Sequence, residues 1–280
     1  MTPKPEADEV LSAGELTILG RIRSASNATF LCEAERDGAS VHCVYKPVAG
    51  EQPLWDFPDG TLAGRELATY LVSSALNWDI VPRTIIRDGP AGPGMCQLWV
   101  EQPGDVQDPE ESETTDEDDT ETGPDLVDLC PAGQLPAGYL PVLRARDYAG
   151  DDVLLIHADD DRLRRMAVFD VLVNNADRKG GHILHSVDDH VFGVDHGLCL
   201  HVEDKLRTVL WGWAGKPVDD ETLEAVAGLV TALDGELAEV LSAHITPIEV
   251  IALEDRARSM LDTARMPTPD RHRPIPWPAF

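Results

Sequence analysis

The sequence is poor in basic residues. Its 280 positions hold 23 Lys and Arg against 51 Asp and Glu, which gives a formal net charge of −28. Such a surface repels the phosphates of nucleic acids and the headgroups of anionic lipids. We therefore expect neither nucleic acid nor a stably associated membrane as a partner, although basic side chains could still cluster locally around a nucleotide.

Long apolar runs and paired cysteines are also absent. No stretch approaches the about 18 apolar residues of a membrane-spanning helix, and the N-terminus, MTPKPEADEV, lacks the apolar run of a signal peptide. The five cysteines are widely spread without a CxxC pair. This pattern favours buried free thiols in a reducing compartment over a disulfide framework or a zinc site. Together these absences predict a cytoplasmic protein.

The first part of the sequence has the pattern of a small α+β lobe over residues 14–104, after a flexible tail over 1–13. The spacing of apolar and small residues predicts a helix over Leu62–Leu76. Five short apolar or alternating runs predict the strands of an antiparallel sheet: 16–19, 28–32, 41–45, 80–87 and 94–101.

The second part is expected to be mostly helical, over residues 142–265, with a proline-rich tail over 266–280. An acidic, Pro/Gly-rich linker or insertion over 105–141 precedes it, because 105–128 holds twelve acidic residues and no Lys or Arg. Apolar periodicity and capping residues predict four helices: 159–175, 219–233, 235–243 and 247–264.

Two carboxylates stand in neighbouring polar loops of the second part. Asp177 follows a helical pattern, and Asp195 follows the short strand pattern 191–194. Phosphoryl transfer to a hydroxyl uses one carboxylate near the acceptor and another that holds a metal against the phosphates. A single Asp in a loop is usually a turn former or a helix cap, but two at this spacing favour a phosphotransfer site.

The sequence around these carboxylates resembles the phosphatidylinositol 3-/4-kinase-like branch of the kinase fold, and more distantly HipA-type and protein kinases. NADR at 175–178 is similar to the start of that family's catalytic loop, and VDHG at 194–197 to its metal motif. The resemblance covers roughly residues 14 to 240, with these two motifs as its specific part. It implies a two-lobed kinase fold that uses ATP with Mg²⁺ or Mn²⁺ and transfers the γ-phosphate to a hydroxyl.

Carried over by position, the resemblance assigns Asp177 and Arg178 to catalysis, with Asp177 orienting the acceptor hydroxyl or accepting its proton. Asp195 would bind the metal. His182 stands where the family has a second metal-binding Asn, and imidazole is a poor ligand for Mg²⁺. His182 could instead bond a phosphate, reach the metal through water, favour a softer ion, or mark a site that has lost its chemistry.

In the small lobe, Lys46 is the candidate for the lysine that reaches the nucleotide's α- and β-phosphates. It ends a strand pattern and is the only lysine between Lys4 and Lys179. Glu66, in the helix that follows, would fix its position. For each of the two residues alone, an exposed surface charge is the competing interpretation.

Two further segments are expected to contact the nucleotide. Ser24, Ser26 and Asn27 lie in a turn that lacks a GxGxxG pattern, but whose hydroxyl and backbone N–H groups could cover phosphates. Val100 lies in the segment 97–102, which we expect to meet the adenine.

The acceptor stays open: a protein, a small molecule or a phosphoinositide. The alternative from another class is a non-catalytic nucleotide-binding pseudokinase or scaffold, which would bind ATP without transferring its phosphate. Transfer of AMP from an inverted nucleotide is a third interpretation, and the mass of the product would identify it.

Overall fold

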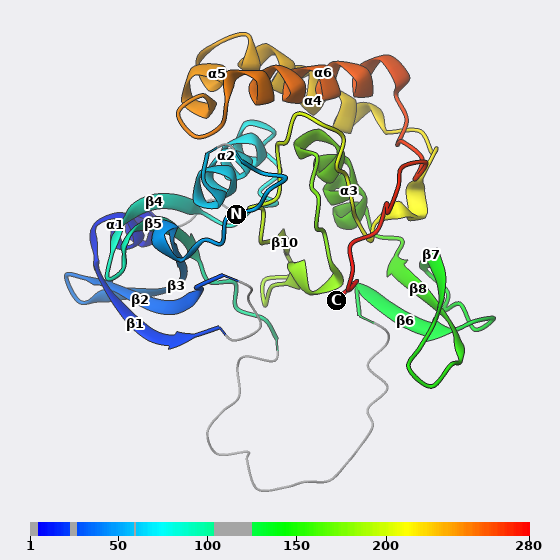
Figure 1. Ribbon diagram of the computed structural model, residues 1–280, viewed down its shortest axis with the longest axis horizontal. Helices are drawn as coiled ribbons and strands as arrows, with labels where there is room; N and C mark the ends of the chain where they lie inside the picture. The colour runs from blue at the N-terminus through cyan, green and yellow to red at the C-terminus, as the bar shows by residue number, and fades with distance from the viewer. Residues whose placement is uncertain (1–4, 23–26, 59, 104–124) are drawn as a thin grey trace, which may run out of the picture.

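The computed structural model describes residues 5–22, 27–58, 60–103 and 125–280, and these form an α+β fold with antiparallel sheets and six α-helices. Figure 1 shows a five-stranded sheet on one side and a three-stranded sheet on the other. Helices α2 and α3 lie between the sheets, under a layer of α4, α5 and α6.

The five-stranded sheet has the order β1-β2-β3-β5-β4, with every neighbouring pair antiparallel. Asp37 and Gly38 connect β2 to β3 with φ angles of 53° and 80°, the left-handed conformation that a tight hairpin requires. The five predicted strands are confirmed, with shifted boundaries: β1 (Glu15–Arg21), β2 (Phe30–Arg36), β3 (Ala39–Pro47), β4 (Thr84–Gly89) and β5 (Gly92–Leu98).

Helix α2 (Leu62–Ala75) is also confirmed, and Thr61 caps it by accepting a hydrogen bond from the Gly64 N–H. The expectation of a flexible tail over 1–13 is wrong for the described residues, because Pro5–Ala13 forms helix α1. Val10 and Leu11 are buried against the sheet, where they pack with Cys32, Cys43 and Cys96, among others. Burial of two apolar side chains therefore orders a short segment that looks polar in sequence.

The described part of the expected linker or insertion over 105–141 contains strands, and the expectation of mostly helical structure is wrong for residues 142–158. Strands β6 (Val127–Pro131), β7 (Tyr139–Arg146) and β8 (Asp152–Ala158) form an antiparallel sheet of order β6-β8-β7. Leu155 and Ile156 of β8 are buried, so the apolar run of this strand anchors the sheet to the core. Residues 104–124 lie outside the described part of the chain.

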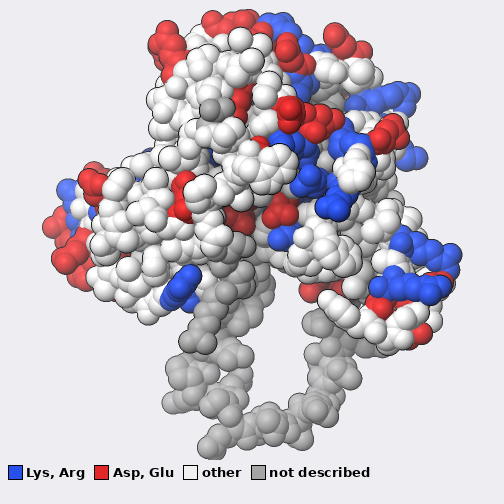
Figure 2. All heavy atoms as spheres, viewed as in Figure 1, with Lys and Arg blue, Asp and Glu red and all other residues white. Residues whose placement is uncertain are grey.

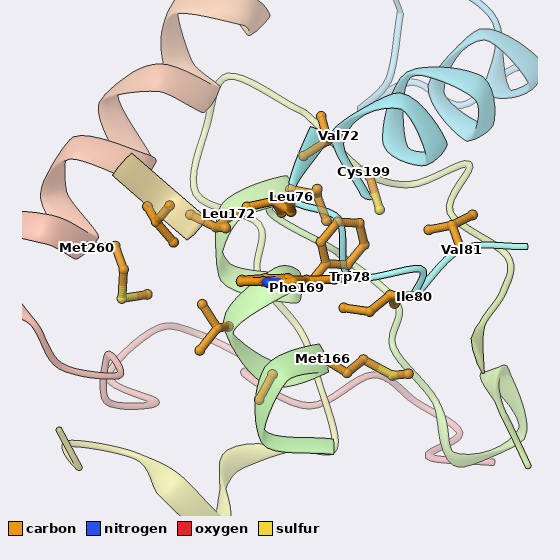
Figure 3. Close-up of a cluster of buried hydrophobic side chains, with 14 of the residues drawn as sticks. Val72, Leu76, Trp78, Ile80, Val81, Met166, Phe169, Leu172, Cys199 and Met260 are labelled. Atoms are coloured by element: carbon orange, nitrogen blue, oxygen red, sulfur yellow. The ribbon is translucent and has the colours of Figure 1, made fainter. Parts of the chain in front are cut away.

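The four predicted helices of the second part are confirmed. Asp160 and Asp219 cap the helices that follow them, and Thr246 with Glu249 forms a capping box. The main core lies among these helices and α2, with Phe169, Leu172, Trp78 and other side chains in contact (Figure 3). The helices are α3 (Asp161–Val173), α4 (Asp220–Leu233), α5 (Glu236–Leu241) and α6 (Pro247–Thr263).

The proline-rich segment 266–280 is extended, as expected, but it packs against the rest of the molecule. The carbonyl of Pro274 accepts hydrogen bonds from the Thr208 N–H and from the Trp211 indole, and the carbonyl of Ala279 accepts one from the Gly180 N–H. The chain therefore returns to the loop that follows α3 (Figure 1).

Two chemical expectations can be checked on the described residues. All five cysteines are free and buried, as the sequence predicted. Among the described helices, none combines the length and the apolar character needed to cross a bilayer.

Candidate functional site

Three segments far apart in sequence meet near the end of β3, the central strand of the five-stranded sheet. Lys46 lies near the end of β3, Glu66 lies in α2, and Asp195 follows β10 (Val191–Gly193). The Lys46 ammonium donates to Glu66 Oε1 at 2.7 Å and to Asp195 Oδ1 at 2.6 Å. We call these three residues the open network, because the Asp195 side chain is 51% exposed.

Glu66, the buried member of the open network, is hydrogen-bonded to the backbone. The Glu66 side chain is 2% exposed, and its Oε2 accepts a hydrogen bond from the His196 N–H at 2.9 Å. Asp195 has a φ of 61°, a left-handed conformation that few residues other than Gly, Asn and Asp adopt. The backbone thus holds the Asp195 carboxylate toward Lys46 at an energetic cost, a pattern found at functional sites.

In the open network, Lys46 and Asp195 stabilise each other's charge, whereas burial and the nearby Asp195 help to raise the pKa of Glu66. Burial by itself would lower the pKa of Lys46, but Asp195 and Glu66 outweigh it and raise that pKa. Lys46 in turn lowers the pKa of Asp195, against the effect of burial. Both groups are therefore ionised at neutral pH, a lysine cation beside a carboxylate that still has accessible oxygens.

Asp177 lies in the loop 175–182 that follows α3, and it lines one pocket together with the open network. Its side chain is 25% exposed, and its Oδ2 is 3.3 Å from the Lys179 ammonium. Burial raises the pKa of Asp177, partly offset by Lys179. A carboxylate with a raised pKa is a better proton acceptor than a fully solvated one.

Arg178 does not reach this pocket and has a different role from the one expected. Its side chain is fully buried, and its Nε and Nη2 donate to Asp170 of α3. Its Nη1 donates at 3.2 Å to the carbonyls of both His182 and Val194. The expected direct part in catalysis is therefore wrong, because Arg178 joins the 175–182 loop to the 194–197 loop from inside.

Asp170 is the centre of a second set of contacts, which we call the buried network. Besides Arg178, it accepts hydrogen bonds from Asn175 Nδ2 at 3.0 Å and from the Thr208 hydroxyl at 3.0 Å. The Asn175 Oδ1 accepts in turn from the Asp177 N–H at 2.9 Å. The buried network, formed by Asp170, Asn175, Arg178 and Thr208, thus fixes the backbone of Asp177.

His182 lies beside Asp195. Its Nε2 is 3.5 Å from Asp195 Oδ2, and its side chain is 16% exposed. Burial lowers the pKa of His182 to about 4, so the imidazole is neutral near pH 7. Its Nδ1 is buried without a hydrogen-bond partner.

The pocket that holds Lys46, Glu66, Asp177 and Asp195 has a volume of about 200 Å³. This is below the about 300–1,000 Å³ of typical small-molecule sites, so it suits a phosphate group better than a whole nucleotide. Asn27 lines it, with Oδ1 accepting from the Gln52 N–H.

Of the other expected nucleotide contacts, Val100 is buried and lines a separate pocket of about 710 Å³, together with residues at the opposite end of β3 from Lys46. The structure thus does not bring Val100 to the open network. Ser24 and Ser26 lie outside the described residues.

Sequence reasoning missed Asp170 and His196. Asp170 occupies the apolar face of α3, at helical spacing from Leu163, Met166 and Ala167, and a carboxylate at such a position signals a buried partner. His196 had no local signal. Its Nε2 accepts a hydrogen bond from Arg178 Nη2 at 2.7 Å, and burial and Arg178 hold its pKa well below the usual value.

No protein-family model matches the chain. The chain is similar to Protein Rv2133c of Mycobacterium tuberculosis (strain H37Rv), with 68% identity over 280 residues, which cover all of this chain and 98% of the relative. The similarity therefore extends over every element that holds the site.

Proposed function

We propose that the chain, which belongs to the family of Protein Rv2133c, is an ATP- and divalent-metal-dependent phosphotransferase of the phosphatidylinositol 3-/4-kinase-like type. It transfers the γ-phosphate to a hydroxyl acceptor. The observation that carries the proposal is the open network, in which Lys46 bonds both Glu66 and Asp195 across separations of 20 and 149 residues. A lysine on strand β3 paired with a helix glutamate, beside a metal-binding aspartate, is the arrangement that kinases use to hold ATP.

The proposed fold is the two-lobed kinase fold. In this proposal the five-stranded sheet with α2 is the small lobe, and α3 to α6 form the larger one. Support comes from the order of parts along the chain: Lys46 on β3, Glu66 on α2, then α3, the 175–182 loop, the β9 (Ile183–His185) and β10 hairpin, and Asp195. The three-stranded sheet is an addition between the two lobes in sequence.

Asp177 and Lys46 would have the main roles among the protein's own side chains. Lys46 would bind the α- and β-phosphates, oriented by Glu66. Asp177 would orient the acceptor hydroxyl and accept its proton, a role that its raised pKa favours. Arg178 would act only as a positioning residue, by holding both loops.

The residues fit a divalent cation. Within the described residues, the polar contact of Asp195 Oδ2 is the one to His182 Nε2 at 3.5 Å. Carboxylate oxygens suit Mg²⁺ and Mn²⁺. The described residues contain no cluster of three or more metal ligands, in keeping with an ion held jointly by one or two carboxylates and the nucleotide. When bound, the metal would neutralise phosphate charge. A neutral His182 could contact it through nitrogen or water.

Partners and location follow from the same proposal. The acceptor is a protein, a small molecule or a phosphoinositide. The strongly negative chain favours an enzyme that uses no nucleic acid and does not bind membranes stably. The free buried cysteines favour the cytoplasm.

One observation favours a second candidate, a pseudokinase or scaffold that binds nucleotide without turnover. His182 occupies the position of the second metal ligand, and its imidazole is neutral and largely buried. Nitrogen is a weak ligand for Mg²⁺, so the second metal contact could be lost.

A transfer assay with radiolabelled ATP and Mg²⁺ or Mn²⁺, paired with calorimetry of ATP binding, tests the proposal. Asp177→Asn is expected to keep ATP binding and to lose at least about 100-fold in turnover, the usual contribution of a general base. The matched control is Asp188→Asn, at an exposed carboxylate that lines the separate pocket near Val100. ATP binding without turnover in the wild type would favour the pseudokinase, and no binding would defeat both candidates.

A further inference from the structure

A third pocket lies apart from the pockets at Lys46 and at Val100. Its volume is about 630 Å³, within the about 300–1,000 Å³ of small-molecule sites. It is formed by the end of α3, the segment 202–206, helix α6 and the segment 265–271. It shares no lining residue with the pocket of the open network.

Three guanidinium groups line this third pocket, from Arg256 on α6 and from Arg265 and Arg271 after it. Arg271 donates to Asp204 Oδ2 at 2.8 Å. Within the described part of the chain, Arg256 and Arg265 form no ion pair and bond only backbone carbonyls. Figure 2 shows Lys and Arg side chains gathered where Figure 1 draws the end of α6 and the C-terminal segment. Such a gathering is unexpected in a chain of net charge −28.

Arg256 lines the pocket, but its donors are held by the protein or closed to solvent. Its Nε donates to the Leu172 carbonyl at 2.8 Å and its Nη1 to the His201 carbonyl at 3.2 Å, and its Nη2 is buried. Burial also lowers the pKa of Arg256 to about 10, because nearby carboxylates do not offset the loss of water.

The rest of the lining favours a ligand with an apolar body. Val171, Val202 and Pro267 contribute partly or fully exposed apolar side chains to the walls. Apolar walls with a few convergent polar groups are typical of sites for small organic molecules.

We propose that this pocket binds a small organic anion, with its acidic head group at Arg265 and Arg271 and its apolar body against Val171, Val202 and Pro267. Asp204 and Asp255 also line the pocket, so the three guanidinium groups face two carboxylates. This balance suits a ligand with one acidic group better than a polyanion such as a nucleotide triphosphate. The site does not depend on the phosphotransfer activity proposed above.

Fluorescence titration of the full chain with anilinonaphthalene sulfonate, an amphipathic anion, tests the site. Arg265→Gln is expected to weaken binding at least about tenfold, since a charge-assisted hydrogen bond is lost. Asp204→Asn is expected to tighten binding, because it removes a competing carboxylate and frees Arg271. Anilinonaphthalene without the sulfonate is expected to bind at least about tenfold more weakly than the anion.

Two matched variants locate the dye. Arg258→Gln, two residues from Arg256 on the exposed side of α6 and paired with Glu254, should bind it as the wild type does. Lys46→Met should as well, since Lys46 lies at a different pocket. The proposal is overturned if the wild type does not bind the anion, if the neutral dye binds equally well, if Arg265→Gln has no effect, or if Lys46→Met removes binding.

Discussion

The open network and the buried network contain the same kind of bond in opposite settings. Lys46 and Asp195 are 2.6 Å apart with side chains 21% and 51% exposed, whereas Arg178 and Asp170 are 2.9 Å apart and fully buried. An exposed ion pair contributes little to stability, but breaking a buried one leaves a charge without compensation. The difference separates the two tasks: the buried network holds the loops in place, and the open network stays available to a ligand.

The largest expected effect comes from breaking the buried network. Arg178→Met should lower the free energy of unfolding by about 3–5 kcal/mol, because the Asp170 charge stays buried without its partner. Urea denaturation followed by circular dichroism measures this. The control, Arg146→Met, removes a side chain that is 77% exposed and paired with Asp152 at 3.4 Å, so it should cost less than about 1 kcal/mol. Equal losses of unfolding free energy in Arg178→Met and Arg146→Met would contradict the stabilising role of the buried network.

The open network should show the reverse behaviour. Asp195→Asn is expected to reduce phosphate transfer at least about 100-fold, the loss typical of removing one charge-stabilising group from an active site. Its free energy of unfolding should change by less than about 1 kcal/mol, because the carboxylate is half exposed. Parallel transfer assays and urea titrations measure both. A large loss of stability with transfer retained would contradict the assignment.

A smaller effect is expected on nucleotide affinity. Lys46→Met should weaken ATP binding about tenfold, because one charge-assisted contact to the phosphates is lost. Calorimetry with ATP and Mg²⁺ measures the change. Lys216→Met, at an exposed position outside the open network, is the control and should bind ATP like the wild type. Equal affinities for all three proteins would argue against a role of Lys46 in nucleotide binding.

The smallest expected effect concerns a buried histidine, whose protonation makes the free energy of unfolding depend on pH. His157 is fully buried, its Nδ1 contacts the Ala158 carbonyl, and its Nε2 accepts from the Gly212 N–H. Burial lowers its pKa below the usual value. The unfolded chain therefore binds more protons than the folded one below about pH 6.5, and stability falls as the pH drops through that window.

His157→Gln removes this proton linkage. The stability difference between wild type and variant should thus be larger at pH 8 than at pH 5, as measured by urea titrations at both values. His272→Gln, at an exposed position, should show no such change. A difference that stays constant with pH for His157→Gln would contradict the inferred linkage.

Members of the open network could be found from the sequence because each stands out locally. Lys46 is a rare lysine at the end of an apolar strand, and Asp195 follows a short strand in a glycine-containing loop. Most strands and helices could be predicted for a similar reason, since their apolar spacing and capping residues are local signals.

The buried network could not be found in this way, because its meaning depends on what packs around it. Arg178 looks like one more polar residue of a loop, and only the fold shows that Asp170 lies opposite it. Helix α1 and the sheet β6-β8-β7 were missed on similar grounds. Two apolar residues order α1 through contacts with the sheet, and the run of β8 lacks the alternation that marks a strand with one exposed face.

The distribution of the cysteines gives this protein a built-in set of reporters. Cys32, Cys43 and Cys96 lie under α1, Cys130 lies in β6, and Cys199 lies beside the open network, all as free buried thiols. Burial raises the pKa of Cys32 to about 12, so its thiol stays protonated and unreactive while the region is closed. A thiol-specific reagent can modify each cysteine only when its surroundings open. Peptide-resolved labelling rates would therefore time the local opening of three separate parts of the molecule without any introduced probe.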